Sequence, residues 1–120
     1  MLRTLIAAFV FAFAPTTHHL RPRVHHARYG PVKITALDLC VANRENGEPG
    51  SYSYSTINWH ADNEYEGAYS EEHAKWVSGG GLRYAAHAYE ATPAQQSAVF
   101  NRQIKTEPGA WPNTLPACGG

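Results

Sequence analysis

The hydrophobic pattern divides the chain into an apolar start, a basic polar stretch and a long mixed remainder. Leu5 to Ala14 is an unbroken run of ten apolar residues that follows one basic residue, Arg3. Such a run is too short for a membrane-spanning helix but matches the hydrophobic region of a secretory signal. Ala12-Phe13-Ala14 has the small residues read by signal peptidase, although Pro15 disfavours cleavage directly after them. We predict a signal peptide over residues 1–14, with an uncleaved anchor or a short core helix as alternatives.

The first helical pattern after this run extends from Thr35 to Arg44. Thr35 is a suitable N-cap, and Asp38 lies in the first turn, where the helix dipole favours an acid. Three apolar residues at helical spacing share one face: Leu37, Cys40 and Val41. Asn46-Gly47 is a typical helix end.

Glu45 falls in the last turn of this helix, at the edge of its apolar face. A carboxyl group there is partly desolvated and lies near the negative end of the helix, and both effects favour its protonated form. A carboxyl that stays protonated near neutral pH can act as a general acid. Glu45 is therefore a candidate catalytic residue, and a surface ion pair with Arg44 or Arg83 is the alternative.

The segment from Gly47 to Trp59 alternates serine and tyrosine with a period of two, which is typical of a strand. We predict a short extended ribbon with an aromatic face. Aromatic rings beside Asn and Ser side chains are common in carbohydrate-binding grooves. The candidate substrate contacts in this segment are Tyr52, Tyr54, Asn58 and Trp59. In the alternative, the segment is a small hairpin whose tyrosines cover the core.

Two more helices are predicted further along. Ser70 as a cap and the two acids after it predict a short helix over residues 70–76, followed by a glycine break at 79–81. Thr92-Pro93-Ala94-Gln95 combines an N-cap, a first-turn proline and a capping box, so it predicts a helix that ends near Lys105. Residues 82–89 suit a helical turn or two, and the tail after residue 110 is predicted to be irregular.

The charges divide the chain in a second way. The 120 residues have no net charge, but residues 15–35 hold four basic residues and no acid, and residues 36–120 carry a net charge of −5. The absence of a net positive charge argues against a nucleic-acid-binding protein. We predict a flexible linker over residues 15–33, rich in Pro and His, and one domain over residues 34–120. The paired histidines of the linker can bind a transition metal, but we predict no specific metal site and no cofactor.

The two cysteines, Cys40 and Cys118, are too few for a four-cysteine zinc site. In an oxidising compartment they are expected to form a disulfide, which would tie the tail to the helix that carries Glu45. The chain-entropy model assigns such a long loop a stabilisation of roughly 4–5 kcal/mol.

Four motifs occur in the order found in one known family. Cys40-Val-Ala-Asn-Arg44-Glu45-Asn46-Gly47 resembles the Cys…Arg-Glu-Ser-Gly-Gly start of transglycosylase-like domains of the resuscitation-promoting-factor type. Tyr65-Glu-Gly67-Ala68-Tyr69, with Trp76 after it, resembles the family's Tyr-x-Gly-Ala-Tyr-Gln-Phe-x-x-x-x-Trp segment. The third motif, Ala91-Thr-Pro93-Ala-Gln95-Gln96, resembles the family's Ala-Ser-Pro-Ala-Glu-Gln helix start. The fourth, Trp111-Pro-Asn-Thr-Leu-Pro-Ala-Cys118-Gly, resembles the family's Trp-Pro…Cys-Gly ending.

The resemblance spans about residues 37–119 and implies a small lysozyme-like fold, which we class as α+β and mainly helical. It implies a secreted, cell-wall enzyme that cleaves the MurNAc–GlcNAc bond of peptidoglycan, with Glu45 as general acid. It adds Tyr65, Tyr69 and Trp76 to the candidate substrate contacts. The expected partners are glycan strands, with weak contact between the basic linker and anionic wall polymers. We expect a monomer that binds no nucleic acid.

The chain departs from the family where Ser70-Glu71 replaces Gln-Phe and where Glu48 replaces a glycine. In the family the Gln contacts substrate and the Phe packs inside. A second hypothesis is therefore a non-catalytic peptidoglycan-binding module of the same fold, and a third is a secreted peptide that binds metal or polyanions through its histidines. The candidates for a second catalytic carboxylate are Asp62, Glu64 and Glu66. The motifs leave open whether the product is a 1,6-anhydro sugar or a hydrolysed end.

Overall fold

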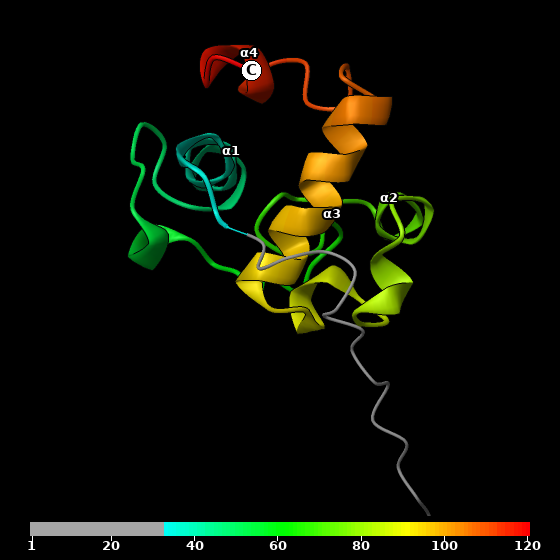
Figure 1. The fold of residues 1–120 in the computed structure, drawn as a ribbon. Coiled ribbons are helices and arrows are strands. Elements are labelled where there is room, and N and C mark those ends of the chain that lie inside the picture. Colours follow the sequence, from blue (N-terminus) through cyan, green and yellow to red (C-terminus); the bar gives the residue numbers. More distant parts are fainter. Residues whose placement is uncertain (1–32) are drawn as a thin grey trace, which may run out of the picture.

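The structure is a computed structural model that describes residues 33–120, so the predicted signal peptide and nearly all of the linker lie outside the described residues. Figure 1 shows a mainly helical domain in which α3 lies in the middle, with α1 on one side and α2 on the other. Residues 33–120 contain no strand, and their single β-pairing is an isolated bridge between Glu66 and Glu71. The mainly helical class and the disulfide are confirmed.

Helix α1 (Ala36–Asn46) begins and ends where the sequence predicts. The Thr35 hydroxyl accepts a hydrogen bond from the Asp38 backbone amide at 3.2 Å, and the Asp38 carboxylate accepts one from the Thr35 amide at 2.8 Å. These reciprocal bonds satisfy two backbone donors that a helix start otherwise leaves unpaired. Gly47 ends the helix.

The prediction of an extended ribbon over residues 47–59 is wrong. Residues 47–59 wrap around α1 as a loop, with one 3-10 turn, η1 (Tyr54–Thr56). Asn43, fully buried in α1, donates a hydrogen bond to the Ser53 carbonyl at 2.9 Å and accepts one from the Thr56 hydroxyl. A buried side chain on the helix therefore satisfies the backbone of this loop, and no partner strand is needed.

Helix α2 (His73–Ser78) begins three residues later than predicted. Ser70 does not cap it, because Ser70 lies in a tight turn with a φ of 49° and the next residue, Glu71, pairs with Glu66. The predicted glycine break is present, with Gly80 in the left-handed region at a φ of 85°. The predicted turns after it form two separate 3-10 helices, η2 (Gly81–Arg83) and η3 (Ala88–Glu90).

Helix α3 (Pro93–Thr106) has the predicted capping box, in which the Thr92 hydroxyl accepts from the Gln95 amide and the Gln95 side chain accepts from the Thr92 amide. The tail is more regular than predicted, because it contains the short helix α4 (Thr114–Ala117). The disulfide between Cys40 and Cys118 joins α4 to α1, with 5.8 Å between the two Cα atoms.

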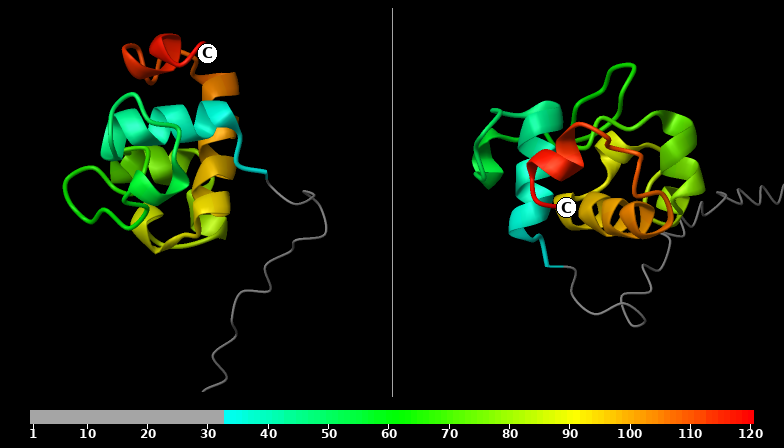
Figure 2. Two further views of the ribbon diagram at one scale, coloured as in Figure 1. Left: turned by 90° about the vertical axis from the view of Figure 1, so that its left-hand side faces the viewer. Right: turned by 90° about the horizontal axis from the view of Figure 1, so that it is seen from above.

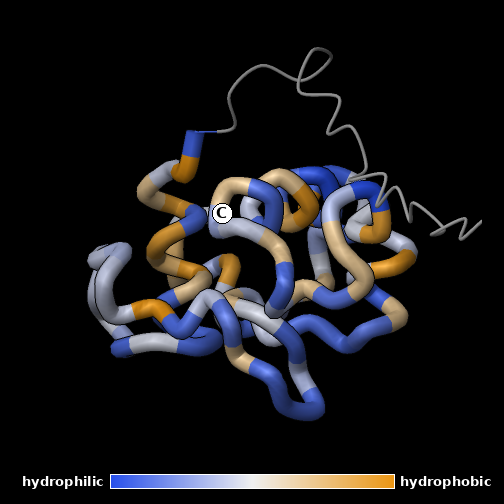
Figure 3. The backbone as a smooth tube through the Cα atoms, turned by 90° about the horizontal axis from the view of Figure 1, so that it is seen from below, coloured by the Kyte–Doolittle hydropathy of each residue, from blue (hydrophilic) through white to orange (hydrophobic). Residues whose placement is uncertain are grey.

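Two apolar clusters form the core, and both include residues of α3, whose course between the other elements can be followed in Figure 2. The larger apolar cluster joins α1, α3 and α4 and comprises Val41, Ala42, Ile57, Trp59, Ala68, Tyr69, Phe100, Trp111 and Leu115. The smaller one joins α2 and α3 and comprises Trp76, Ala88, Ala91 and Val99. Figure 3 shows that apolar residues occur in short stretches spread along the chain, so each element contributes only a few side chains to the core.

None of the helices in the described part of the chain is long and apolar enough to cross a membrane.

Candidate functional site

Glu45 lies in the last turn of α1 and is partly buried. One oxygen of its carboxylate, Oε1, accepts a hydrogen bond from the hydroxyl of Thr114, the first residue of α4. The disulfide ties α4 to α1, so the covalent link and this hydrogen bond act on the same pair of helices. The predicted connection between the tail and the helix of Glu45 is confirmed.

The backbone around Glu45 is held by two further segments. The Ser70 hydroxyl donates to the Glu45 carbonyl at 3.1 Å. The side-chain amide of Asn46 donates to the Gly67 carbonyl at 2.9 Å. The backbone carbonyl of Asn46 accepts a hydrogen bond from the Asn58 backbone amide at 3.1 Å. The bonds to the Glu45 and Asn46 carbonyls occupy groups that a helix end leaves without intrahelical partners, so the last turn of α1 is fixed in place.

A shallow, wide-open surface groove of about 670 Å³ includes Glu45 in its lining. Its other lining residues come from the end of α1 and the following loop: Asn46, Gly47, Glu48, Pro49, Thr56 and Asn58. The groove thus combines one partly buried carboxyl group with amide and hydroxyl side chains. Such a surface can hydrogen-bond to sugar hydroxyls while an acid acts on the bond between two sugars.

The structure separates the predicted substrate contacts into two groups. Asn58 lines the groove, and Tyr52 and Tyr54 are exposed by 56% and 51% on the loop that borders it. Tyr65 is also exposed, by 45%, but it lines a different cavity.

The other three predicted contacts lie in the core. Trp59, Tyr69 and Trp76 are exposed by 6%, 1% and 0%. Side chains this deeply buried present no ring face to a sugar. The prediction that these three residues contact substrate is therefore wrong, and they are core residues. Tyr69 stacks on Phe100 with 4.4 Å between ring centroids, and its hydroxyl pairs with Ser97 at 2.7 Å. The aromatic positions of the motif, Tyr69 and Trp76, therefore contribute to packing.

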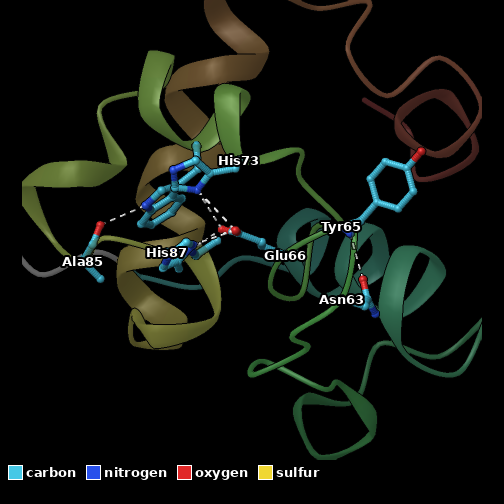
Figure 4. Close-up of polar contacts among 8 residues, drawn as sticks. Asn63, Tyr65, Glu66, His73, Ala85 and His87 are labelled. Atoms are coloured by element: carbon cyan, nitrogen blue, oxygen red, sulfur yellow. Dashed lines mark hydrogen bonds and ion pairs between the residues drawn. The ribbon is translucent and has the colours of Figure 1, made fainter.

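Glu66, one of the candidates for a second carboxylate, is 7% exposed and lies in a cluster with two histidines (Figure 4). Its Oε1 lies 2.7 Å from His87 Nδ1 and 3.2 Å from His73 Nδ1, and its Oε2 accepts from the Ala88 amide at 3.1 Å. Burial raises the pKa of Glu66, but these hydrogen bonds outweigh it and the pKa lies below its usual value. The hydrogen bond to Glu66 raises the pKa of His87. Glu66 is therefore held as an anion.

Glu71 is another buried carboxyl, and it stands where the motif that this segment resembles has phenylalanine. It is 4% exposed and accepts a hydrogen bond from Gln103 at 2.8 Å. Burial raises the pKa of Glu71 to about 7, and the charge of Glu66 adds to this effect. Glu71 lines a cavity of about 230 Å³ between α2, α3 and the segment that contains Trp111.

The Glu66–His73–His87 cluster was not predicted, because its members are spread along the chain without a ligand-like spacing. Adjacent histidines occur only in the linker, at His18-His19 and His25-His26. The available signal was weak: His73 and His87 flank a glycine break, and a chain reversal there can bring them together.

No family model matches the chain. No curated protein matches it either. The interpretation therefore rests on the residues and their geometry.

Proposed function

We propose that this chain is a secreted peptidoglycan-cleaving glycosidase that uses Glu45 as general acid and base on the MurNAc–GlcNAc bond. The observation that carries the proposal is the placement of Glu45, a partly buried carboxyl that lines an open groove and accepts a hydrogen bond from Thr114. The helix end that carries it is held by hydrogen bonds to Ser70 and Gly67. The motifs around Glu45 and the disulfide, which suits an extracellular protein, support it.

The chemistry follows from this single acid. Protonated Glu45 donates its proton to the glycosidic oxygen, so the leaving sugar departs as an alcohol and positive charge develops at the anomeric carbon. The resulting carboxylate then takes a proton from the nucleophile. If the nucleophile is the 6-hydroxyl of the same sugar, the product is a 1,6-anhydro end, as in a lytic transglycosylase. If it is water, the product is a reducing end, as in a lysozyme-type muramidase.

The hydrogen bond from Thr114 suits this double role. It engages Oε1 of Glu45, and no hydrogen bond within residues 33–120 occupies Oε2. One oxygen thus orients the group while the other remains available for proton transfer.

Replacing Glu45 tests the proposal. Glu45→Gln keeps the shape of the side chain but removes the acidic proton, so release of soluble fragments from purified peptidoglycan should fall by at least about a hundredfold. Mass analysis of the products separates anhydro ends from reducing ends.

Glu90→Gln is the matched control, because Glu90 is an exposed carboxylate that lines neither the groove nor the cavity. It should leave the rate unchanged. Unchanged fragment release by Glu45→Gln, in protein with the parent's circular dichroism, would remove Glu45 from the mechanism.

One observation favours a second candidate, a non-catalytic peptidoglycan-binding module. Ser70 stands where the family has a substrate-contacting Gln, and its hydroxyl is bound to the Glu45 carbonyl. A member that lacks this contact can bind glycan strands without cleaving them. Binding of the parent chain to purified sacculi without release of soluble fragments would favour this candidate.

A further inference from the structure

The cluster of Glu66, His73 and His87 brings together three segments that are separated in the chain. Glu66 belongs to the isolated bridge, His73 is the first residue of α2, and His87 directly precedes η3. Figure 4 shows both imidazole rings directed at the same carboxylate. Their ring centroids are 4.6 Å apart.

We propose that Glu66, His73 and His87 bind a divalent transition-metal ion, with zinc as the occupant, through one carboxylate oxygen and the two Nδ1 atoms. This site is independent of the proposed glycan cleavage. One ligand atom from each residue lies within 4.8 Å of the others. Zinc–ligand bonds of about 2.1 Å in a tetrahedral site place ligand atoms roughly 3.4 Å apart. The Nδ1–Oε1 distances of 2.7 and 3.2 Å need only small changes to reach this spacing.

The ligand set selects the type of ion. Two imidazole nitrogens and one carboxylate oxygen suit zinc and related transition metals, whereas magnesium and calcium prefer oxygen ligands alone. The His73 and His87 side chains are 49% and 38% exposed, so a fourth position can be filled by water. The buried carboxylate supplies a negative charge that partly neutralises the ion.

Neighbouring groups already hold two of the ligands in position. The Ala88 amide donates to Glu66 Oε2 at 3.1 Å and fixes the carboxylate, whose Oε1 lies 2.7 Å from His87 Nδ1. The ring of Tyr89 stacks on His87 with 5.0 Å between centroids and an angle of 14° between the planes. Such supporting contacts orient metal ligands and raise affinity. A bound ion would link the bridge, α2 and η3, so it should stabilise the domain.

The test must separate this cluster from the other histidines. The linker contains His18, His19, His25 and His26, and the domain contains His60. His60 is an exposed histidine whose Nδ1 contacts the Tyr89 carbonyl at 2.9 Å, so His60→Asn is a matched control. A second control replaces all four linker histidines with Asn in the otherwise intact chain.

The measurements are zinc titration by calorimetry and Tm with and without zinc. His73→Asn and His87→Asn should each weaken zinc binding at least tenfold, because each removes a direct ligand. Both controls should bind zinc like the parent chain. Zinc at a hundred times its Kd should raise the Tm of the parent and of the controls by at least about 10 °C.

Nitrogen-15 NMR of the histidine rings identifies the binding atom. Zinc should shift the Nδ1 resonances of His73 and His87 and leave the proton on Nε2. Three results would overturn the proposal: no zinc binding by the parent chain, binding that disappears in the linker variant, or parent-like binding by both His73→Asn and His87→Asn. His73 and His87 are partly exposed, so their variants should fold, and circular dichroism verifies this.

Discussion

At the scale of single residues, the position after Ser70 shows how a buried carboxyl group takes the place of an aromatic ring. Glu71 lies where the motif that this segment resembles has phenylalanine, and it is as buried as a core residue. The resemblance therefore predicts an internal position here, although it does not predict the residue that fills it. The carboxyl is accommodated by Gln103, which donates to it at 2.8 Å.

Glu71 should make the stability of the domain fall as the pH rises. Its pKa is about 7 in the folded protein, against an ordinary value of 4.5. Below pH 4.5 the group is protonated in both folded and unfolded states and has no effect. Between pH 4.5 and 7 the unfolded chain loses this proton while the folded domain keeps it, so the free energy of unfolding decreases by roughly 3 kcal/mol.

Glu71→Gln tests this effect, because the amide cannot ionise and still offers an oxygen to Gln103. The variant should be more stable than the parent by roughly 3 kcal/mol at pH 8 and nearly equal to it at pH 4, as measured by urea unfolding. Glu72→Gln changes an exposed neighbour and should show no such difference. An equal gain at both pH values would mean that ionisation of Glu71 is not its cause.

At the scale of elements, the contact between α1 and α4 determines how Glu45 is held. The hydroxyl of Thr114 engages one oxygen of Glu45, and no residue nearer in sequence does so. This gives α4, a helix of only four residues, a specific part in the candidate site.

Thr114→Val should slow peptidoglycan cleavage by roughly tenfold or more, because the carboxyl loses the group that orients it. Valine has nearly the same volume, so the free energy of unfolding should change by no more than about 2 kcal/mol. Both quantities are measured on the same preparation. Thr106→Val, which removes a hydroxyl bonded only within α3, is the control. A parent-like rate for Thr114→Val would show that orientation of Glu45 does not depend on this bond.

The helix starts show what sequence alone can predict. The starts of α1 and α3 were predictable because the capping boxes of Thr35 and Thr92 involve residues three positions apart. The start of α2 was not, because the pairing of Glu71 with Glu66 takes precedence over the local capping signal of Ser70. Likewise, the alternation around Tyr54 predicted a strand, but a buried amide on α1 binds that loop instead.

The candidate site follows the same division between local and distant contacts. Glu45 was predictable, since its place at the end of α1 depends on local spacing. The burial of Trp59, Tyr69 and Trp76 was not, because neither composition nor a motif resemblance distinguishes an aromatic ring in a groove from one in the core. Thr114 and the histidine cluster depend on chain segments far apart, so no local pattern indicates them.

At the scale of the whole molecule, the disulfide joins the beginning and the end of the described domain. Cys40 and Cys118 are separated by 78 positions, so the bond encloses both core clusters and all but the first turn of α1. A bond that closes so long a loop restricts the unfolded chain strongly. It also keeps Thr114 near Glu45, so stability and the candidate activity depend on the same bond.

Replacing both cysteines, Cys40→Ser together with Cys118→Ser, should therefore have two effects that can be measured separately. The free energy of unfolding should fall by roughly 4–5 kcal/mol, a large share of the net stability of a small domain. At a temperature where circular dichroism shows the variant still folded, cleavage of peptidoglycan should also be slower than in the parent, because α4 is no longer tied to α1. Thr114→Val in the same background should then slow cleavage less than it does in the parent, since the two changes disturb one contact. Additive effects on the rate would contradict a shared role for the disulfide and Thr114 in placing Glu45.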